Sequence, residues 1–546
     1  MARLTTFIRV WFIGLLLAEK ASAQEKCFDA PPLEIENKHF FTLDGAFVPI
    51  RGIAYYPRPN AGPNDKNNID FYTEEYRHMW ERDVSRLREL NVNAIRIYAV
   101  DPGKNHDAFM CACKSAGIYV IIGLGANCAN CSITSAPAPA CYPPELKTRG
   151  EFIISVFSKY TNVLGFSAGN EVGLLFDALN EPERNGPCQK KSIRDMRAFI
   201  QSCSTMRKIP VGLAVADVER ELNAAYYGCR SDPDDNLENA EWYGINTYQH
   251  CNSLQTNPQE LTGFQNLLRD FSQIGLSIPV VLAEYGCINE SFLTTGGFED
   301  QRTFLQVETL FSPVYLQEFT GGFVFEYSIE RVNAMSPWPF EEFGSGRYGV
   351  GYFAPENCDD INITCSYVPT PEFENLSAAY AAVSVNTPPA SSARSEVTEC
   401  PEQFPALSSF DWSSDSVISR QCPQPVTVSC PVVPGCGSTM SPNTTLTAIP
   451  TSPISDSPSQ IPSTPLPMIS TALPTASTRV TTSPQPTDGI PLDAPSAAPS
   501  NRTPTQKPVL RSLPPFPSNS LTVGSSGKQR NHLESSFAFL LVAWFL

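Results

Sequence analysis

Eight short apolar segments, rich in β-branched residues, recur along the chain and are separated by helix-like segments. They are residues 47–56, 93–100, 117–125, 163–170, 209–217, 242–248, 278–286 and 321–328. Between the first two, residues 71–91 carry apolar side chains at helical spacing, and residues 192–206 form a similar helical segment. Near-continuous apolar strands alternating with helices predict a parallel sheet covered on both faces, and eight such units predict a (β/α)8 TIM barrel. An open doubly wound sheet is the alternative, but no Gly-x-Gly-x-x-Gly follows the first strand to support it.

Two of the predicted strands end on a glutamate, Glu171 in GFSAGNEVG and Glu284 in IPVVLAEYGC. An acidic residue that closes a hydrophobic strand is costly to bury, so it needs a structural or a chemical reason. The carboxyl ends of the strands form the active face of a TIM barrel, so both carboxylates can project into one cleft. Cleavage of a glycosidic bond needs such a pair, about 5 Å apart if the configuration is retained. We therefore expect Glu171 to be the acid/base and Glu284 the nucleophile; the alternative is that one of them is a buried ion-pair partner.

Polar and aromatic residues near the same strand ends are candidates for sugar binding. Asn170, beside the expected acid, is suited to hydrogen-bond the 2-hydroxyl of the sugar as the transition state develops. Six tyrosines lie at or near the strand ends: Tyr55, Tyr56, Tyr98, Tyr243, Tyr248 and Tyr327. Because the C–H face of a sugar ring stacks on an aromatic ring, this set favours a groove for a polysaccharide. Each tyrosine taken singly is also compatible with the core.

The two ends of the sequence read as targeting signals rather than as parts of a folded domain. Residues 1–23 have a basic start, an apolar centre and a small-x-small site, which predicts a cleaved signal peptide; a short membrane anchor is the alternative. Residues 527–546 join a polar spacer to a 12-residue apolar tail, too short to cross a hydrocarbon core about 30 Å thick. Small residues precede the spacer, and this pattern predicts GPI attachment with removal of the tail.

Between the catalytic domain, expected over residues 24–390, and the tail lie two further regions. Residues 391–440 contain cysteines and prolines and form either a small stapled knot or a loop-rich extension of the main domain. Residues 441–526 are expected to form a stalk, because 441–520 hold 18 Pro, 14 Ser and 13 Thr in 80 residues. Such a segment cannot bury enough apolar surface to offset the entropy of ordering it, so we expect it to be extended and O-glycosylated.

The cysteines and the charge limit the classes of partner. All 17 cysteines lie between Cys27 and Cys436, which in an exported chain indicates disulfides, with at least one thiol left over. Zinc is the alternative for the CANC and CAC sequences, but the histidines are few and scattered. The net charge of −17 and the lack of a basic patch argue against nucleic acid. Six sequons predict N-glycosylation at Asn130, Asn289, Asn362, Asn375, Asn443 and Asn501.

Eight motifs occur in order across residues 38–355: RGIAYYP, NAIRIYAVDPGKNHDAFM, GFSAGNEV, SIRDMRAFI, RKIPVGLAVAD, INTYQHC, LAEYGC and GGFVFEYS. Together they resemble glycoside hydrolase family 72, the β-1,3-glucanosyltransferases of fungal and related cell walls. The resemblance implies a (β/α)8 enzyme, usually GPI-anchored, that needs no metal or cofactor. Such an enzyme cuts an internal β-1,3-glucan linkage with retention and transfers the new reducing end to another glucan chain. We expect a monomer that binds glucan donor and acceptor chains at the outer leaflet of the plasma membrane, with the cell wall as a second location.

The resemblance also assigns residues. It places the acid/base on Glu171 and the nucleophile on Glu284, and it assigns sugar contacts to Tyr98, Asn170, Tyr327, Arg220 and Asp217. It implies a disulfide between Cys251 and Cys287, and a disulfide from Cys229 to Cys358 or Cys365.

Some positions depart from the pattern of the family. Tyr56 stands in place of a glutamine, Ile245 in place of a tyrosine and His250 in place of a tryptophan. An early disulfide is replaced by two aromatics, Trp80 and Phe109. We interpret the chain as a divergent member with intact chemistry and a remodelled groove. A retaining endo-β-glucanase or mannanase and a non-catalytic glucan-binding surface protein are the alternatives.

Overall fold

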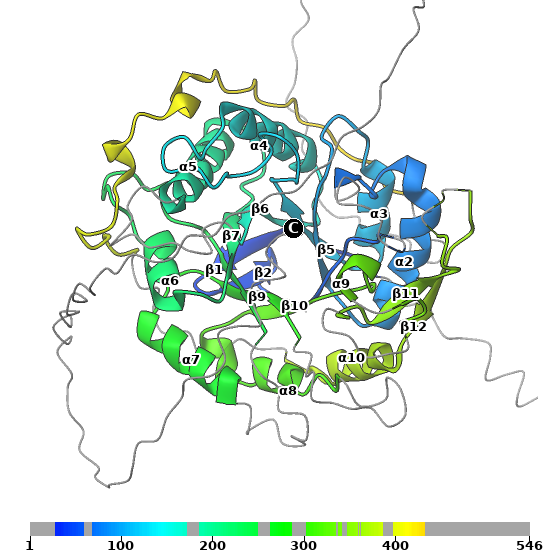
Figure 1. Ribbon diagram of the computed structural model, residues 1–546. Helices are drawn as coiled ribbons and strands as arrows, with labels where there is room; N and C mark the ends of the chain where they lie inside the picture. Colours follow the sequence, from blue (N-terminus) through cyan, green and yellow to red (C-terminus); the bar gives the residue numbers. More distant parts are fainter. Residues whose placement is uncertain are drawn as a thin grey trace, which may run out of the picture. The chain divides into compact units, whose positions relative to one another are not determined.

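The computed structural model describes residues 28–58, 60, 68–171, 185–248, 262–286, 302–334, 337–340, 347–358, 360, 362–385 and 397–431. Eight parallel strands close into a barrel in the order β10-β3-β4-β5-β6-β7-β8-β9 (Figure 1). They are β3 (Ile50–Ala54), β4 (Ala94–Ile97), β5 (Tyr119–Gly123), β6 (Val163–Asn170), β7 (Val211–Ala216), β8 (Tyr243–Thr247), β9 (Val280–Tyr285) and β10 (Gly321–Val324). Each strand lies within one of the eight predicted segments, so the TIM-barrel prediction is confirmed. The prediction succeeds because strands buried on both faces must be apolar along their whole length.

Helices surround the barrel on all sides (Figure 1). They are α2 (Arg77–Glu89), α3 (Asp107–Ser115), α4 (Pro144–Phe157), α5 (Gly186–Ser202), α6 (Arg220–Gly228), α7 (Thr262–Ile274), α8 (Gln306–Leu310), α9 (Arg331–Ala334) and α10 (Pro371–Ala382). The predicted helical segment 71–91 begins with a short 3-10 turn, η2 (Glu74–Tyr76), and continues as α2. The apolar face of α2 is buried, as its spacing requires. Within the ranges given above, no helix combines the length and the apolarity that a bilayer span requires.

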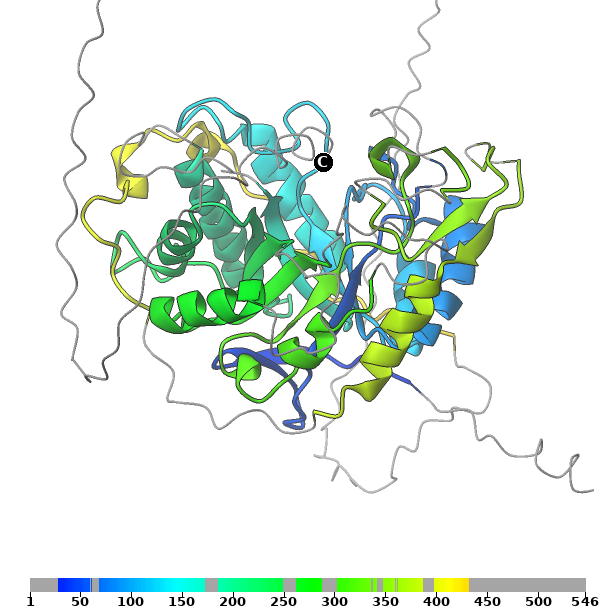
Figure 2. The ribbon, with the colours of Figure 1, turned by 60° about the horizontal axis from the view of Figure 1, so that its bottom comes forward.

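A β-hairpin closes the amino-terminal end of the barrel. Its strands, β1 (Leu33–Glu36) and β2 (His39–Thr42), pair antiparallel and appear in dark blue at the bottom of Figure 2. Leu33 and Phe40 from this hairpin pack in one buried cluster with Trp242 and Phe323 from the barrel. The cluster fills the barrel interior at this end, so the amino-terminal end of the barrel is closed by packed side chains. A second antiparallel pair, β11 (Gly351–Ala354) and β12 (Ser366–Pro369), lies outside the barrel.

Residues 397–431, here called the outer segment, run around the helices on the outside of the barrel (Figure 1, yellow). The segment contains only two short 3-10 helices, η5 (Leu407–Ser409) and η6 (Ser413–Ser416). Three disulfides attach it to helices or helix ends: Cys229–Cys400, Cys203–Cys422 and Cys111–Cys430. Of the two arrangements considered for this region, the structure has the loop-rich extension.

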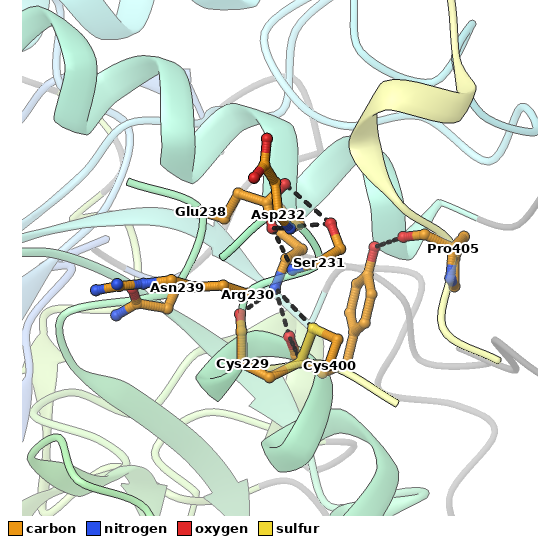
Figure 3. Close-up of a disulfide and its surroundings, with 10 residues drawn as sticks. Cys229, Arg230, Ser231, Asp232, Glu238, Asn239, Cys400 and Pro405 are labelled. Carbon is orange, nitrogen blue, oxygen red and sulfur yellow. Dashed lines mark hydrogen bonds between the residues drawn. A yellow bond between two sulfur atoms is a disulfide. The ribbon is translucent and has the colours of Figure 1, made fainter. Parts of the chain in front are cut away.

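The expected partner of Cys229 was wrong. Cys229 is bonded to Cys400, as Figure 3 shows, and Cys358 is bonded to Cys365. The backbone explains this choice, because Arg230 donates its N–H to the Thr398 carbonyl at 3.0 Å and accepts from the N–H of Cys400 at 2.7 Å. This short strand-like pairing brings the outer segment alongside Cys229. The expected Cys251–Cys287 pair lies outside the described residues.

The other cysteines that the structure describes follow the expectation for an exported chain. Cys128 is bonded to Cys131 and Cys141 to Cys188, so the CANC sequence forms a disulfide here. Cys113 is a free and buried thiol, which accounts for an odd cysteine.

The sequons fall into three groups. Asn130 and Asn362 are exposed at the surface. Asn375 is half-buried and its side-chain nitrogen donates to the Arg302 carbonyl at 3.1 Å, so only the other N–H of this amide is free to be replaced by a glycan while the bond is kept. Asn289, Asn443 and Asn501 lie outside the described residues, as do the predicted signal peptide, stalk and GPI-attachment tail.

Candidate active site

The two glutamates singled out by the sequence lie at the carboxyl end of the barrel. Glu171 directly follows β6, and Glu284 is the penultimate residue of β9. Glu171 has φ of 51°, in the left-handed region that a residue with a side chain seldom adopts. Its N–H donates to the Ala214 carbonyl at 2.9 Å, which fixes this turn against β7. Strain held at such a position is frequent at functional sites.

Three donors surround the carboxylate of Glu284. Arg96 of β4 donates from Nη1 to Oε1 at 2.8 Å, and the Tyr98 hydroxyl donates to the same oxygen at 3.1 Å. The Tyr248 hydroxyl donates to Oε2 at 2.7 Å. Burial opposes the charge on Arg96, but Tyr98, Glu284 and Glu171 together hold its pKa above the ordinary value. The guanidinium therefore stays charged and compensates a carboxylate whose side chain is only 2% exposed.

A pair of asparagines connects Glu284 to Glu171. Arg96 also donates from Nη2 to Asn170 Oδ1 at 2.5 Å. Asn246 of β8 donates from Nδ2 to the same Asn170 oxygen at 3.2 Å and to Glu171 Oε1 at 3.0 Å. One continuous hydrogen-bonded cluster thus brings together Glu171, Asn170, Tyr98 and Glu284. All four were named from the sequence as site residues.

The two carboxyl groups have different environments, and the environment of Glu171 favours its protonated form. Burial raises the pKa of Glu171 to about 7, and the negative charge of Glu284 acts in the same direction. Arg96 is hydrogen-bonded to Glu284 directly, whereas its hydrogen bonds reach Glu171 through the two asparagines and its charge only partly offsets the rise in the Glu171 pKa. A carboxylic acid beside a compensated carboxylate is the arrangement that acid-assisted nucleophilic displacement requires.

Three other predicted sugar contacts are bonded to residues outside this cluster. Tyr327 is fully buried, and its hydroxyl donates to Asp83 Oδ1 at 2.9 Å. Asp217 and Arg220 form an ion pair at 2.7 Å, and Arg220 also pairs with Asp270 of α7 at 2.5 Å. These groups are engaged with the protein itself, and their role in sugar binding stays a prediction.

The six tyrosines noted in the sequence divide between the site and the core. Tyr98 and Tyr248 bond Glu284, and Tyr56 lines a pocket beside the cluster. Tyr55, Tyr243 and Tyr327 have no exposed surface. Tyr248 also forms an aromatic group with Phe325 and Tyr348, with ring centroids 5.2–6.2 Å apart.

The pocket lies over the carboxyl ends of β4, β5, β6 and β10, and the loop at residues 125–133 forms one wall. Its lining includes Arg96, Tyr98 and Asn170, so it adjoins the cluster described above. Glu326 and the buried ion pair of Arg58 with Glu330 complete the other wall. Burial raises the pKa of Glu326 to about 8, Arg58 and Arg302 act against that rise, and the charge of Glu284 adds to it.

The sequence reasoning missed Arg96, Asn246 and Glu326. Each carried a signal, since each is a polar residue at or within an otherwise apolar barrel segment. Glu326 is the second residue after β10, whereas Glu171 directly follows β6, and the family resemblance assigned a role to the neighbouring Tyr327 instead. Trp80 and Phe109, noted as replacements for a disulfide, are in edge-to-face contact with ring centroids 5.8 Å apart.

Comparison with known proteins places this site in a family. The profile of glycoside hydrolase family 72, described as glucanosyltransferase, matches residues 22–335, more than half of the chain. The chain belongs to glycoside hydrolase family 72.

The similarity to individual family 72 proteins covers parts of their length. The 1,3-beta-glucanosyltransferase gas1 of Schizosaccharomyces pombe is 31% identical over 318 residues, which are 58% of this chain and 52% of that protein. The 1,3-beta-glucanosyltransferase gel1 of Aspergillus fumigatus is 28% identical over 403 residues, 73% of this chain and 75% of that protein. The chain therefore spans between about half and three quarters of the length of these relatives.

A solved structure of a family 72 protein has the same fold. Gas2p of Saccharomyces cerevisiae, in complex with laminaritriose and laminaritetraose, aligns with a TM-score of 0.52 and 26% identity. The alignment covers 68% of this chain and 74% of that chain.

Proposed function

We propose that this protein is a retaining β-1,3-glucan transglycosylase. It cleaves an internal β-1,3-glucan linkage and transfers the new reducing end to the non-reducing end of another glucan chain. The observation that carries the proposal is the cluster in which Glu171, with a pKa of about 7, is linked to the Arg96-bound Glu284. The names of the family relatives, 1,3-beta-glucanosyltransferases, support the choice of reaction and substrate.

In the first step, Glu171 gives its proton to the glycosidic oxygen while a Glu284 oxygen attacks the anomeric carbon. The bond to the leaving chain breaks and a covalent glycosyl-enzyme forms. Arg96, Tyr98 and Tyr248 orient the Glu284 carboxylate through the hydrogen bonds described above. In the second step, Glu171 takes the proton from an acceptor hydroxyl, which attacks the anomeric carbon and releases Glu284.

We further propose that the protein acts at the cell surface as a monomer, anchored by GPI to the outer leaflet of the plasma membrane. The predicted signal peptide (residues 1–23) and the predicted attachment signal (residues 527–546) support this location. Cell-wall glucan then supplies both the donor and the acceptor chains.

The test is to incubate the mature protein with a reduced laminari-oligosaccharide and to measure the lengths of the products. Products longer than the input indicate transfer, whereas shorter products alone indicate an endo-β-glucanase. Glu171→Gln and Glu284→Gln should each leave only a small residual amount of both kinds of product. Glu151→Gln is the matched control, because Glu151 is a fully buried carboxyl on α4 that bonds the Arg420 N–H of the outer segment. Unchanged products from both site variants would mean that the proposed mechanism is wrong.

A further inference from the structure

Glu326 is a buried carboxyl group at the pocket that the proposed mechanism does not use. The residue is 4% exposed, yet it lines the pocket beside Arg96, Tyr98 and Asn170. Within the part of the chain that the structure describes, its Oε1 has no hydrogen-bond partner. A buried polar atom without a partner costs about 1–3 kcal/mol, so its retention in a pocket wall points to a ligand that supplies the bond.

The backbone holds Glu326 firmly in this wall. Its N–H donates to the Tyr348 carbonyl at 3.0 Å, and its carbonyl accepts from Val350 at 3.0 Å. The preceding carbonyl, of Phe325, accepts from Arg302 Nη2 at 2.7 Å. The backbone that carries the carboxyl group is therefore held in the pocket wall before any ligand arrives, which lowers the cost of ordering it on binding.

The charges around Glu326 decide its protonation. Arg58 and Arg302 both favour the carboxylate, but the Arg58 guanidinium is bonded to Glu330 and Arg302 has the weaker effect. Burial and the charge of Glu284 favour the neutral acid. A neutral carboxyl group offers one donor and one acceptor side by side, and this pair matches the hydroxyl groups of a sugar ring.

We propose that Glu326 is a substrate-binding residue whose carboxyl group hydrogen-bonds hydroxyls of the glucose unit that lies next to the cleaved linkage. The inference rests on the proposed function, because the pocket takes glucose only if the substrate is a glucan. It differs from the assignment of the neighbouring Tyr327, whose hydroxyl is bonded to Asp83 in the core.

Binding should be measured in a Glu171→Gln background, which prevents turnover and removes the titration of Glu171. The charge of Glu284, which adds to the rise in the pKa of Glu326, is kept in this background. Laminaripentaose is titrated calorimetrically into this single variant, the parent. It is also titrated into double variants that carry Glu326→Leu or Glu326→Gln in addition. Leu removes both hydrogen-bonding groups at similar size, and Gln keeps a donor and an acceptor.

We expect Glu326→Leu to weaken laminaripentaose binding by about 5- to 30-fold and Glu326→Gln to restore most of that loss. Binding to the parent should weaken as the pH rises through about 8 and Glu326 ionises. Covering an ionised carboxylate with a sugar costs more desolvation free energy than covering the neutral acid. With Glu326→Gln this pH dependence should disappear. Equal affinity and equal pH dependence for the parent and Glu326→Leu would overturn the inference.

Two controls separate the possible failures. Glu151→Gln alters a buried carboxyl group that also has an unpartnered oxygen among the described residues but lies outside the pocket, and it should leave binding unchanged. If the parent itself binds no laminari-oligosaccharide, the proposed glucan activity is wrong rather than the role of Glu326. If Glu326→Leu does not fold, Glu326→Gln still decides the matter through its pH dependence.

Discussion

The two ends of the barrel bury different kinds of side chain. At the amino-terminal end, Leu33 and Phe40 of the hairpin pack with Trp242 and Phe323 in an apolar cluster. At the carboxyl end, a buried arginine, two asparagines and two glutamates share hydrogen bonds. An apolar cluster gains free energy from burial, whereas buried charges lose solvation that hydrogen bonds only partly return. The amino-terminal end should therefore carry stability, and the carboxyl end chemistry.

Of the single substitutions, Glu284→Gln should have the largest effect on the chemistry at the carboxyl end of the barrel. The amide keeps the shape of the side chain but is a poor nucleophile, so the rate of transfer should fall by about 10⁴-fold or more. Chain-length analysis of the products measures the rate, and thermal unfolding in parallel checks the fold. A rate within tenfold of the wild type would contradict the assignment.

Phe40→Ala, at the amino-terminal end of the barrel, should lower stability and leave the rate of transfer unchanged. Removing a buried aromatic ring should lower the free energy of unfolding by about 3–5 kcal/mol, as measured in urea. The rate of transfer by the folded protein should not change, because the ring is at the other end from the glutamates. Leu43→Ala is the matched control, since Leu43 follows the same hairpin and is 63% exposed. A loss of kcat with Phe40→Ala would mean that the two ends are not independent.

The double variant Cys229→Ser/Cys400→Ser tests how much the attachment of the outer segment contributes to the free energy of unfolding. This disulfide joins residues 171 positions apart, and its loss should lower the free energy of unfolding by about 2–4 kcal/mol. Cys128→Ser/Cys131→Ser should cost less, because that bond spans only three positions. Equal costs for the two double variants would show that loop closure is not the source of the stability.

The pH dependence of the rate tests the carboxyl end without a mutation. Because the pKa of Glu171 is raised to about 7, its acid form persists near neutrality and is lost as the pH rises further. The initial rate of donor cleavage should therefore fall about tenfold per pH unit above 7. The residual rate of Glu171→Gln should lack this fall. A wild-type rate that declines already above pH 5 would mean that burial does not protect the proton.

The contrast between apolar and polar burial also explains which parts of the fold and of the site could be predicted from the sequence. The eight barrel strands were predicted because their apolar runs reflect burial on both faces, and Glu171 and Glu284 stood out because acids interrupt those runs. Arg96 and Asn246 interrupt them as well, but only the closed barrel shows that β4, β6, β8 and β9 bring them together. Periodicity gives no information about which polar residues will meet across a barrel.

Two other features depended on long-range packing. The hairpin Leu33–Thr42 is too short to be recognised from the sequence alone. Only its packing against the amino-terminal end of the barrel identifies it. The Cys229–Cys400 pairing required the path of the outer segment, which contains no strand and no α-helix to predict. Resemblance to a family could not supply that path either, because the matched motifs end before residue 397.

The outer segment has a mechanical consequence. Its last disulfide joins Cys430 to Cys111 on α3, 319 positions earlier in the chain. A pulling force applied to the polypeptide beyond Cys430 is therefore transmitted covalently to α3, and the outer segment does not carry that load alone. The outer segment is thereby protected from being pulled away from the helices by a load on the chain that follows it.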